Sequence, residues 1–190
     1  MSRTIMSFRL WLAAGFAAAA LAWPQAASAQ PPAAPARESA VKAAFLYKFG
    51  SYVDWPAGTF ASAGEPLVIG VVGEDAVVEE LEQLAAGRTV EGRPVRVRAF
   101  RDSETPSGVH VLFVGNLRPA RLRELLAAVP GPALVVTQQE GALRAGSMIN
   151  FVSDGTRIRF AVSPASAEAR GIRLSARLLA VAQAVEGRAH

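Results

Sequence analysis

The sequence predicts one α/β domain, a layered sandwich with a mainly parallel central sheet, an antiparallel C-terminal hairpin and flanking helices. Three observations predict it. Short runs rich in branched apolar residues recur at 67–72, 109–115 and 133–138, which is typical of strands buried on both faces. Segments with helical spacing of apolar residues lie between these runs. Two further apolar runs flank an Asp-Gly pair at 154–155, which favours a hairpin turn.

The first expected element is a helix over residues 38–55, which stops at Pro56 because proline disfavours helical backbone in the residue before it. Tyr47 points away from the apolar face of this helix, and Trp55 lies where the helix ends. An exposed tyrosine without a role is the alternative to a binding role for Tyr47. The helical projection places six apolar side chains on one face: Val41, Phe45, Leu46, Phe49, Tyr52 and Val53.

Strands and helices then alternate through the middle of the chain. Asp75 is the expected N-cap of the first of these helices, and Pro119 suits the first turn of the second. Arg96 and Arg98 alternate with valines, so they face away from the core on an edge strand, where charge opposes unwanted pairing. The expected elements are strands at 67–72, 93–100, 109–115 and 133–138, with helices at 75–86 and 119–129.

A hairpin formed by residues 147–152 and 157–162 precedes a long last helix, expected over residues 165–186. An apolar stripe on this helix needs either neighbouring elements or a partner, and we expect it to form part of a homodimer contact. A basic stripe on the same helix either meets an acidic partner or is a solvated face. The apolar stripe consists of Leu174, Leu178, Val181 and Val185, and the basic stripe of Arg170, Arg173 and Arg177.

The first 29 residues have the three parts of a secretory signal peptide. These are a basic start with Arg3 and Arg9, an apolar run at 10–22 and a small-residue cleavage site at 27–29. The run is about 13 residues long, whereas a membrane-spanning helix needs roughly 20. We therefore expect cleavage after Ala29, with an uncleaved anchor as the alternative. A proline-rich, disordered leader is expected at 30–37, followed by a single domain at 38–187.

Composition and charge exclude several classes of protein. The cleaved chain keeps 18 basic and 16 acidic residues, a net charge of +2 that gives little support to a nucleic-acid or membrane-surface partner. The sequence has no cysteine, which excludes disulfides, thiolate nucleophiles and cysteine-ligated metals. His110 lies in a buried strand, where a hydrogen-bonded core histidine is expected, and His190 is terminal. No carboxylates have metal-ligand spacing, so no metal, cofactor or catalytic site is expected.

Five segments, in order over about residues 41–185, carry a resemblance to a known family. They are VKAAFLYKFGSYVDWP, PLVIGVVGED, GVHVLFVG, GSMINFVSDGTRIRFAVSPASAEARGI and RLSARLLAVA. Together they resemble the YfiR family of periplasmic proteins. The sequence departs from the family pattern at Val109, where a cysteine is common, so disulfide control of folding does not operate here. It departs also at Ala161-Val162-Ser163 and at Ser175-Ala176.

The resemblance implies an exported regulator with an α/β sandwich fold and a tendency to dimerise. A regulator of this kind restrains a membrane-bound diguanylate cyclase by binding its periplasmic part, which lowers cyclic di-GMP and biofilm formation. An outer-membrane lipoprotein can sequester the regulator and release the cyclase.

We therefore expect a periplasmic binding protein, not an enzyme, that represses a membrane diguanylate cyclase by protein contact. Candidate partner contacts, selected for exposure and charge, are Tyr47, Trp55, Arg170, Arg173 and Arg177. The first alternative is a sensor domain acting with another signalling protein, in which a hydrophobic pocket between the first and last helices takes a small ligand. The second is an enzyme that depends on His110.

Overall fold

The described part of the computed structural model comprises residues 34–153, 155 and 157–186, with side chains from residue 38 onward. The secretory signal predicted at 1–29 lies outside these residues, and helix α1 begins at Ala34, inside the segment expected to be a leader. The predicted α/β class is confirmed, because helices flank a mainly parallel sheet that also contains antiparallel pairs.

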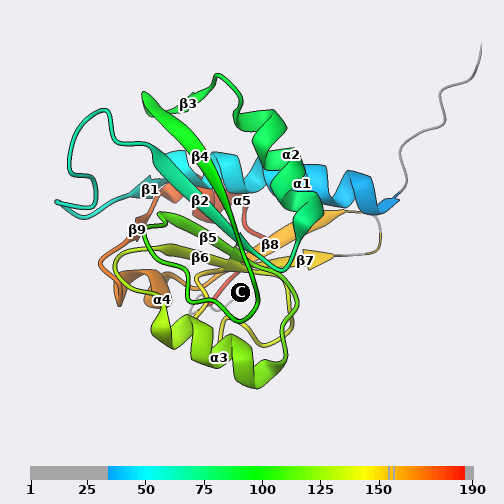
Figure 1. The fold of residues 1–190 in the computed structure, drawn as a ribbon. Coiled ribbons are helices and arrows are strands. Elements are labelled where there is room, and N and C mark those ends of the chain that lie inside the picture. Colours follow the sequence, from blue (N-terminus) through cyan, green and yellow to red (C-terminus); the bar gives the residue numbers. More distant parts are fainter. Residues whose placement is uncertain (1–33, 154, 156, 187–190) are drawn as a thin grey trace, which may run out of the picture. The chain divides into compact units, whose positions relative to one another are not determined.

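Eight strands form the main sheet in the order β10-β8-β7-β6-β5-β2-β4-β3 (Figure 1). Neighbours from β4 to β7 are parallel, whereas β7 and β8 form the expected antiparallel hairpin. At the two ends, β3 is antiparallel to β4 and β10 is parallel to β8. The strand bounds are β2 Leu67–Val72, β3 Thr89–Val90, β4 Arg93–Phe100, β5 Val111–Val114, β6 Leu134–Thr137, β7 Ile149–Ser153, β8 Ile158–Val162 and β10 Ala184–Val185.

Helices cover both faces of the sheet (Figure 1). On one face lie α1 (Ala34–Phe49) and α2 (Asp75–Ala85), and on the other lies α3 (Pro119–Ala128). Because side chains alternate along a strand, Phe113 of β5 joins the core on the α1 side, while Leu112 joins the core under α3. This burial on both faces explains why β5 and β6 are apolar at nearly every position.

The aromatic residues of the first helix form its contact with the sheet, as expected. Phe45 and Phe49 pack against Phe151 of β7 and Phe160 of β8, with ring centroids 5.2–6.0 Å apart. Val41 differs from the expectation, because its side chain is 40% exposed. Val41 lies at the margin of the projected apolar face, next to the solvent-exposed side of α1.

The prediction that the first helix extends to residue 55 is wrong. The α-helix ends at Phe49, a 3₁₀ turn covers Gly50–Tyr52, and the chain becomes extended in β1 (Val53–Asp54). A Cβ at Gly50 would lie 2.5 Å from Leu67 Cδ2, so the glycine lets the turn approach β2 closely. Tertiary pairing of β1 then outweighs the local helical preference.

The long last helix predicted at 165–186 is also wrong. The segment contains α4 (Pro164–Glu168), β9 (Arg173–Leu174), α5 (Ala176–Val181) and the two-residue strand β10. Gly171 has a φ of 71°, a left-handed conformation that ends the first helical stretch. Ser175 then caps α5, because its side chain accepts a hydrogen bond from the backbone N–H of Leu178.

The apolar stripe therefore does not form one face of one helix. Leu174 belongs to β9 and Val185 to β10, while Leu178 and Val181 belong to α5. Leu178 is fully buried in the main core, whereas Val181 is 63% exposed. A smaller correction concerns α2, whose N-cap position is occupied by Glu74, with Asp75 as the first helical residue. A carboxylate there still interacts favourably with the helix dipole.

Candidate interaction surface

A two-stranded sheet, separate from the main one, joins two segments that are far apart in the sequence. In it β1 is antiparallel to β9, with Asp54 opposite Arg173. The backbone N–H of Ser175 extends the pairing by donating to the carbonyl of Tyr52 at 3.0 Å. Trp55 follows β1 directly, so the pairing brings it to the same region as Arg173, and Arg177 follows in the first turn of α5. Three of the five candidate contacts are therefore near one another along the backbone, with Trp55 half-buried against the core and the two arginines exposed.

Tyr47 lies elsewhere, on the side of α1 that meets β3. Its hydroxyl donates a hydrogen bond to the backbone carbonyl of Thr89 at 2.9 Å, and its half-buried ring packs against the main core. The side chain thus ties the first helix to the end of the sheet.

Arg170 has a structural role at the end of α3. Its guanidinium donates to the backbone carbonyls of Leu126 and Val129, at 2.5 and 2.9 Å. These carbonyls belong to the last turn of α3 and its C-cap, where a positive charge also complements the helix dipole. Arg170 does not share a helix face with Arg173 and Arg177, because the helix that was expected to hold all three is interrupted. The latter two side chains are exposed.

Trp55 belongs to an aromatic cluster that the sequence did not reveal. The Phe60 ring stacks on the His110 ring, with centroids 4.4 Å apart and planes 15° apart. Trp55 meets both rings edge-on, at 6.1 Å from each centroid. The guanidinium carbon of Arg93 lies 3.8 Å from the Phe60 centroid, a cation–π contact. Trp55 and Phe60 come from the loop after β1, whereas His110 immediately precedes β5 and Arg93 begins β4, so no local spacing could have indicated the cluster.

His110 is a hydrogen-bonded core residue, as expected, with 7% of its surface exposed. Its Nδ1 accepts a hydrogen bond from the backbone N–H of Val68 at 3.0 Å. Burial lowers the pKa of His110 below its ordinary value of 6.5. The positive charge of Arg93 lowers that pKa further, while the carboxylate of Glu65 and a backbone hydrogen bond at Thr59 oppose the shift. The imidazole is therefore neutral at pH 7, with Nδ1 as the acceptor.

Arg93 also holds the loop that carries Phe60. Its Nη1 donates to three backbone carbonyls, those of Ser62 at 2.7 Å, Ala63 at 3.1 Å and Glu65 at 3.0 Å. A hollow of about 470 Å³ opens beside this loop. It is lined by Val53, Asp54, Trp55, Pro56, Gly58, Thr59, Phe60 and Arg93.

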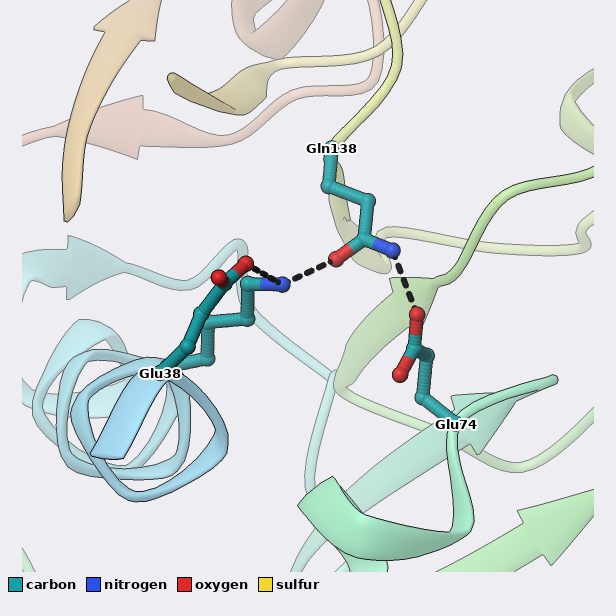
Figure 2. A network of polar contacts seen from close by, with 4 residues as sticks. Glu38, Glu74 and Gln138 are labelled. Atoms are coloured by element: carbon teal, nitrogen blue, oxygen red, sulfur yellow. Dashed lines mark hydrogen bonds and ion pairs between the residues drawn. The ribbon is translucent and has the colours of Figure 1, made fainter. Parts of the chain in front are cut away.

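A polar network lies at the carboxyl ends of the parallel strands. Lys42 of α1 is buried, with its ammonium 2.6 Å from a carboxylate oxygen of Glu38 and 2.6 Å from the side-chain oxygen of Gln138, to which it donates (Figure 2). The amide nitrogen of Gln138 in turn donates to Glu74. A buried ammonium is stable only when it is paired and hydrogen-bonded, and this network supplies both conditions.

The network borders the position where the strand order reverses. After β2 the chain continues to β4 on one side of β2, whereas β5 lies on the other side. In open α/β sheets, ligands bind in the crevice outside the carboxyl ends of the strands at such a point. Here a crevice of about 370 Å³ is lined by Glu38, Ser39, Lys42, Glu74, Ala76, Val77, Asn116 and Gln138.

Neither region has the arrangement of a metal centre. Within the described residues, no three histidine or carboxylate side chains are grouped so that they could hold a metal ion. The Trp55 region contains aromatic side chains and arginines, which are residue types typical of protein–protein contacts.

A sequence profile of the family described as YfiR/HmsC-like matches residues 39–183. The chain belongs to the YfiR/HmsC-like family. The matched stretch runs from α1 through α5 and includes every strand of the main sheet except β10. The YfiR/HmsC-like family is periplasmic, regulatory rather than catalytic, and known for regulation of diguanylate cyclases. A search among curated proteins found no match. In the part of the chain that the structure describes, no helix has the length and apolarity to cross a bilayer.

Proposed function

We propose that this YfiR/HmsC-like protein is a periplasmic repressor that acts on a membrane-bound diguanylate cyclase by protein contact. The observation that carries the proposal is the family match over residues 39–183, which spans the whole described core. To repress, the protein must bind the inactive conformation of the cyclase more tightly than the active one. A hundredfold preference shifts the equilibrium by about 2.7 kcal/mol.

The surface that best suits this contact is the region of Trp55, Arg173 and Arg177. Its exposed groups are the guanidiniums of Arg173 and Arg177, which lie near the half-buried Trp55 along the backbone, and aromatic residues and arginines are enriched at protein interfaces. Because Tyr47 and Arg170 both bond to backbone carbonyls within the fold, we assign them a weaker share of the contact.

The proposal is tested by cyclic di-GMP measurements in a strain that lacks the gene. Complementation uses either the full chain or a chain that starts at Pro31 and is not exported. A rise in cyclic di-GMP on deletion, reversed only by the full chain, is the expected result. Unchanged cyclic di-GMP on deletion would contradict repression of a cyclase.

Homodimerisation remains part of the proposal. Val181 is the best candidate among the four apolar residues predicted for the contact, since it is a large apolar side chain that is 63% exposed. Leu178 contributes to the core instead, and Leu174 and Val185 are half-buried. Light scattering at micromolar concentrations tests the dimer, and a monomeric mass would contradict it.

The crevice at the carboxyl ends of β2 and β5 favours a second candidate, a sensor for a small polar ligand. It differs from the hydrophobic pocket expected between the first and last helices, because Lys42, Glu74 and Gln138 line it. A thermal-shift screen of polar metabolites with the purified mature chain tests this candidate, since a ligand stabilises the protein by mass action without a protein partner.

A further inference from the structure

Strand β4 leaves one long edge of the main sheet open. Its neighbour on the outer side, β3, pairs only with Arg93 and Pro94. In the described residues, no strand pairs with the outer side of the next six positions, 95–100. At the opposite end of the sheet, the two residues of β10 pair with positions 161–162 of β8, and the backbone N–H of Gln183 donates to the carbonyl of Phe160 at 2.9 Å, so only positions 158–159 are left without an outer partner among the described residues. The edge of β4 is therefore the longer of the two.

The side chains of β4 alternate between the two faces of the sheet. Val95 and Val97 pack against the core under α1 and α2. Arg96 and Arg98 lie on the opposite face, and both are exposed. Since alternate residues of a strand point the same way, the two guanidinium groups are presented side by side along the edge.

One of these arginines is held in place. Arg98 donates a hydrogen bond from Nη1 to the backbone carbonyl of Ser107 at 2.8 Å, and its guanidinium carbon lies 4.7 Å from the Phe100 centroid. Neither Arg96 nor Arg98 forms an ion pair with any described residue. The edge thus carries two positive charges that the described part of the fold does not neutralise.

These charges distinguish between two occupants of the edge. A second copy, paired about a two-fold axis at Val97, would place Arg96 opposite Arg98 of the other copy, and like charges directly opposite each other destabilise a strand pair. An acidic strand would instead place a carboxylate beside each guanidinium. The same arginines that oppose pairing between copies therefore favour an extended acidic segment.

We propose that the open edge of β4, residues 95–100, binds an extended acidic segment of the partner protein as an added strand. Backbone hydrogen bonds hold the segment, and Arg96 and Arg98 select carboxylates at every second position. The inference rests on the proposed function, because it assigns a second contact to a regulator that acts by protein binding.

The first test is fluorescence anisotropy with the mature chain and a labelled eight-residue peptide in which valine and glutamate alternate. Binding of this peptide, with weaker binding of the valine–lysine peptide and none of a fully N-methylated valine–glutamate peptide, is expected. The R96E/R98E variant should bind the glutamate peptide about tenfold more weakly than wild type and should prefer the lysine peptide. R96E alone, which leaves the Arg98 contacts intact, should show a smaller loss.

The control variant is R123E/R157E, which has the same change in net charge at two other exposed arginines and should bind like wild type. Three results would overturn the inference: no binding of the glutamate peptide by the wild-type chain, equal binding of the methylated peptide, or equal affinities of R96E/R98E and the control variant.

Cyclic di-GMP in the deletion strain separates this inference from the proposed function. Loss of repression with R96E/R98E, but not with R123E/R157E, supports both. Peptide preference without any effect of the deletion on cyclic di-GMP would overturn the proposed function and leave the edge assignment standing. Full repression by R96E/R98E would overturn the edge assignment and leave the proposed function standing.

Discussion

Lowering the pH from about 7.5 to about 5 is expected to reduce the free energy of unfolding of the mature chain, because the buried His110 has no room for a second proton. Its Nδ1 already accepts the hydrogen bond from Val68. Protonation would place a proton on Nδ1 against that N–H group and would charge a ring that is 93% buried, since only 7% of its surface is exposed.

The sign follows from the direction of the pKa shift. Burial lowers the pKa of His110 in the folded state below 6.5, the ordinary value expected in the unfolded chain. Between the two pKa values the unfolded chain binds more protons, so stability falls as the pH falls below 6.5. Because the unfolded chain takes up this proton near pH 6.5, one histidine can lower the free energy of unfolding by at most about 2 kcal/mol between pH 7.5 and 5, and a loss of about 1–2 kcal/mol is expected.

Urea unfolding followed by tryptophan fluorescence measures this difference directly. Trp11 and Trp23 lie in the predicted signal peptide, so Trp55 is the sole tryptophan of the mature chain, and it contacts His110 edge-on at 6.1 Å. His110→Asn retains a hydrogen-bond acceptor that does not titrate, and it should remove the loss between pH 7.5 and 5. His190→Asn is the matched control and should retain it. Equal unfolding free energies of the wild-type chain at both pH values, or the same loss in His110→Asn, would refute the reasoning.

Three further predictions concern stability, each measured by urea unfolding at pH 7. Gly50→Ala should cost about 1–3 kcal/mol, because the added Cβ would lie 2.5 Å from Leu67 Cδ2. The control Gly64→Ala has no atom within 4 Å of the added Cβ and should leave the free energy of unfolding unchanged. Equal effects of the two substitutions would contradict the packing argument. Arg170→Ala should cost about 1.5–3 kcal/mol through the loss of its bonds to the end of α3, and Arg177→Ala should have little effect. Lys42→Met should cost about 1–3 kcal/mol because it leaves the Gln138 oxygen without its donor. The control Lys48→Met, at an exposed site on the same helix, should change the free energy of unfolding by less than about 0.5 kcal/mol. A neutral Lys42→Met would show that the network adds no net stability.

Most strands could be predicted because their signal is local. The buried strands of a parallel sheet need apolar residues at nearly every position, and the run at Leu67–Val72 coincides with an observed strand. The alternation of valine and arginine within Arg93–Phe100 coincides with another strand, which has one exposed face. The hairpin between β7 and β8 was equally clear, since its turn residues are adjacent in the sequence.

The candidate site was only partly predictable. Trp55, Arg173 and Arg177 were selected from the sequence for exposure and charge, and the pairing of β1 with β9 brings them near one another along the backbone. Phe60 and Arg93 were missed, because their roles depend on contacts with His110 and with a loop about 30 residues away. No periodicity encodes a contact of that kind.

The sequence by itself determined the α/β class, the positions of the main strands along the chain and the family, since each depends on local patterns or on motifs read in order. Only the tertiary structure decided the secondary structure of the segments that follow Phe49 and Glu168. In both places a helical pattern gives way to a short strand, because Gly50 and Gly171 interrupt the helices and β1 pairs with β9 across more than a hundred residues. Local propensity is worth less than about 1 kcal/mol per residue, so packing and backbone pairing supplied by a distant segment can reverse it.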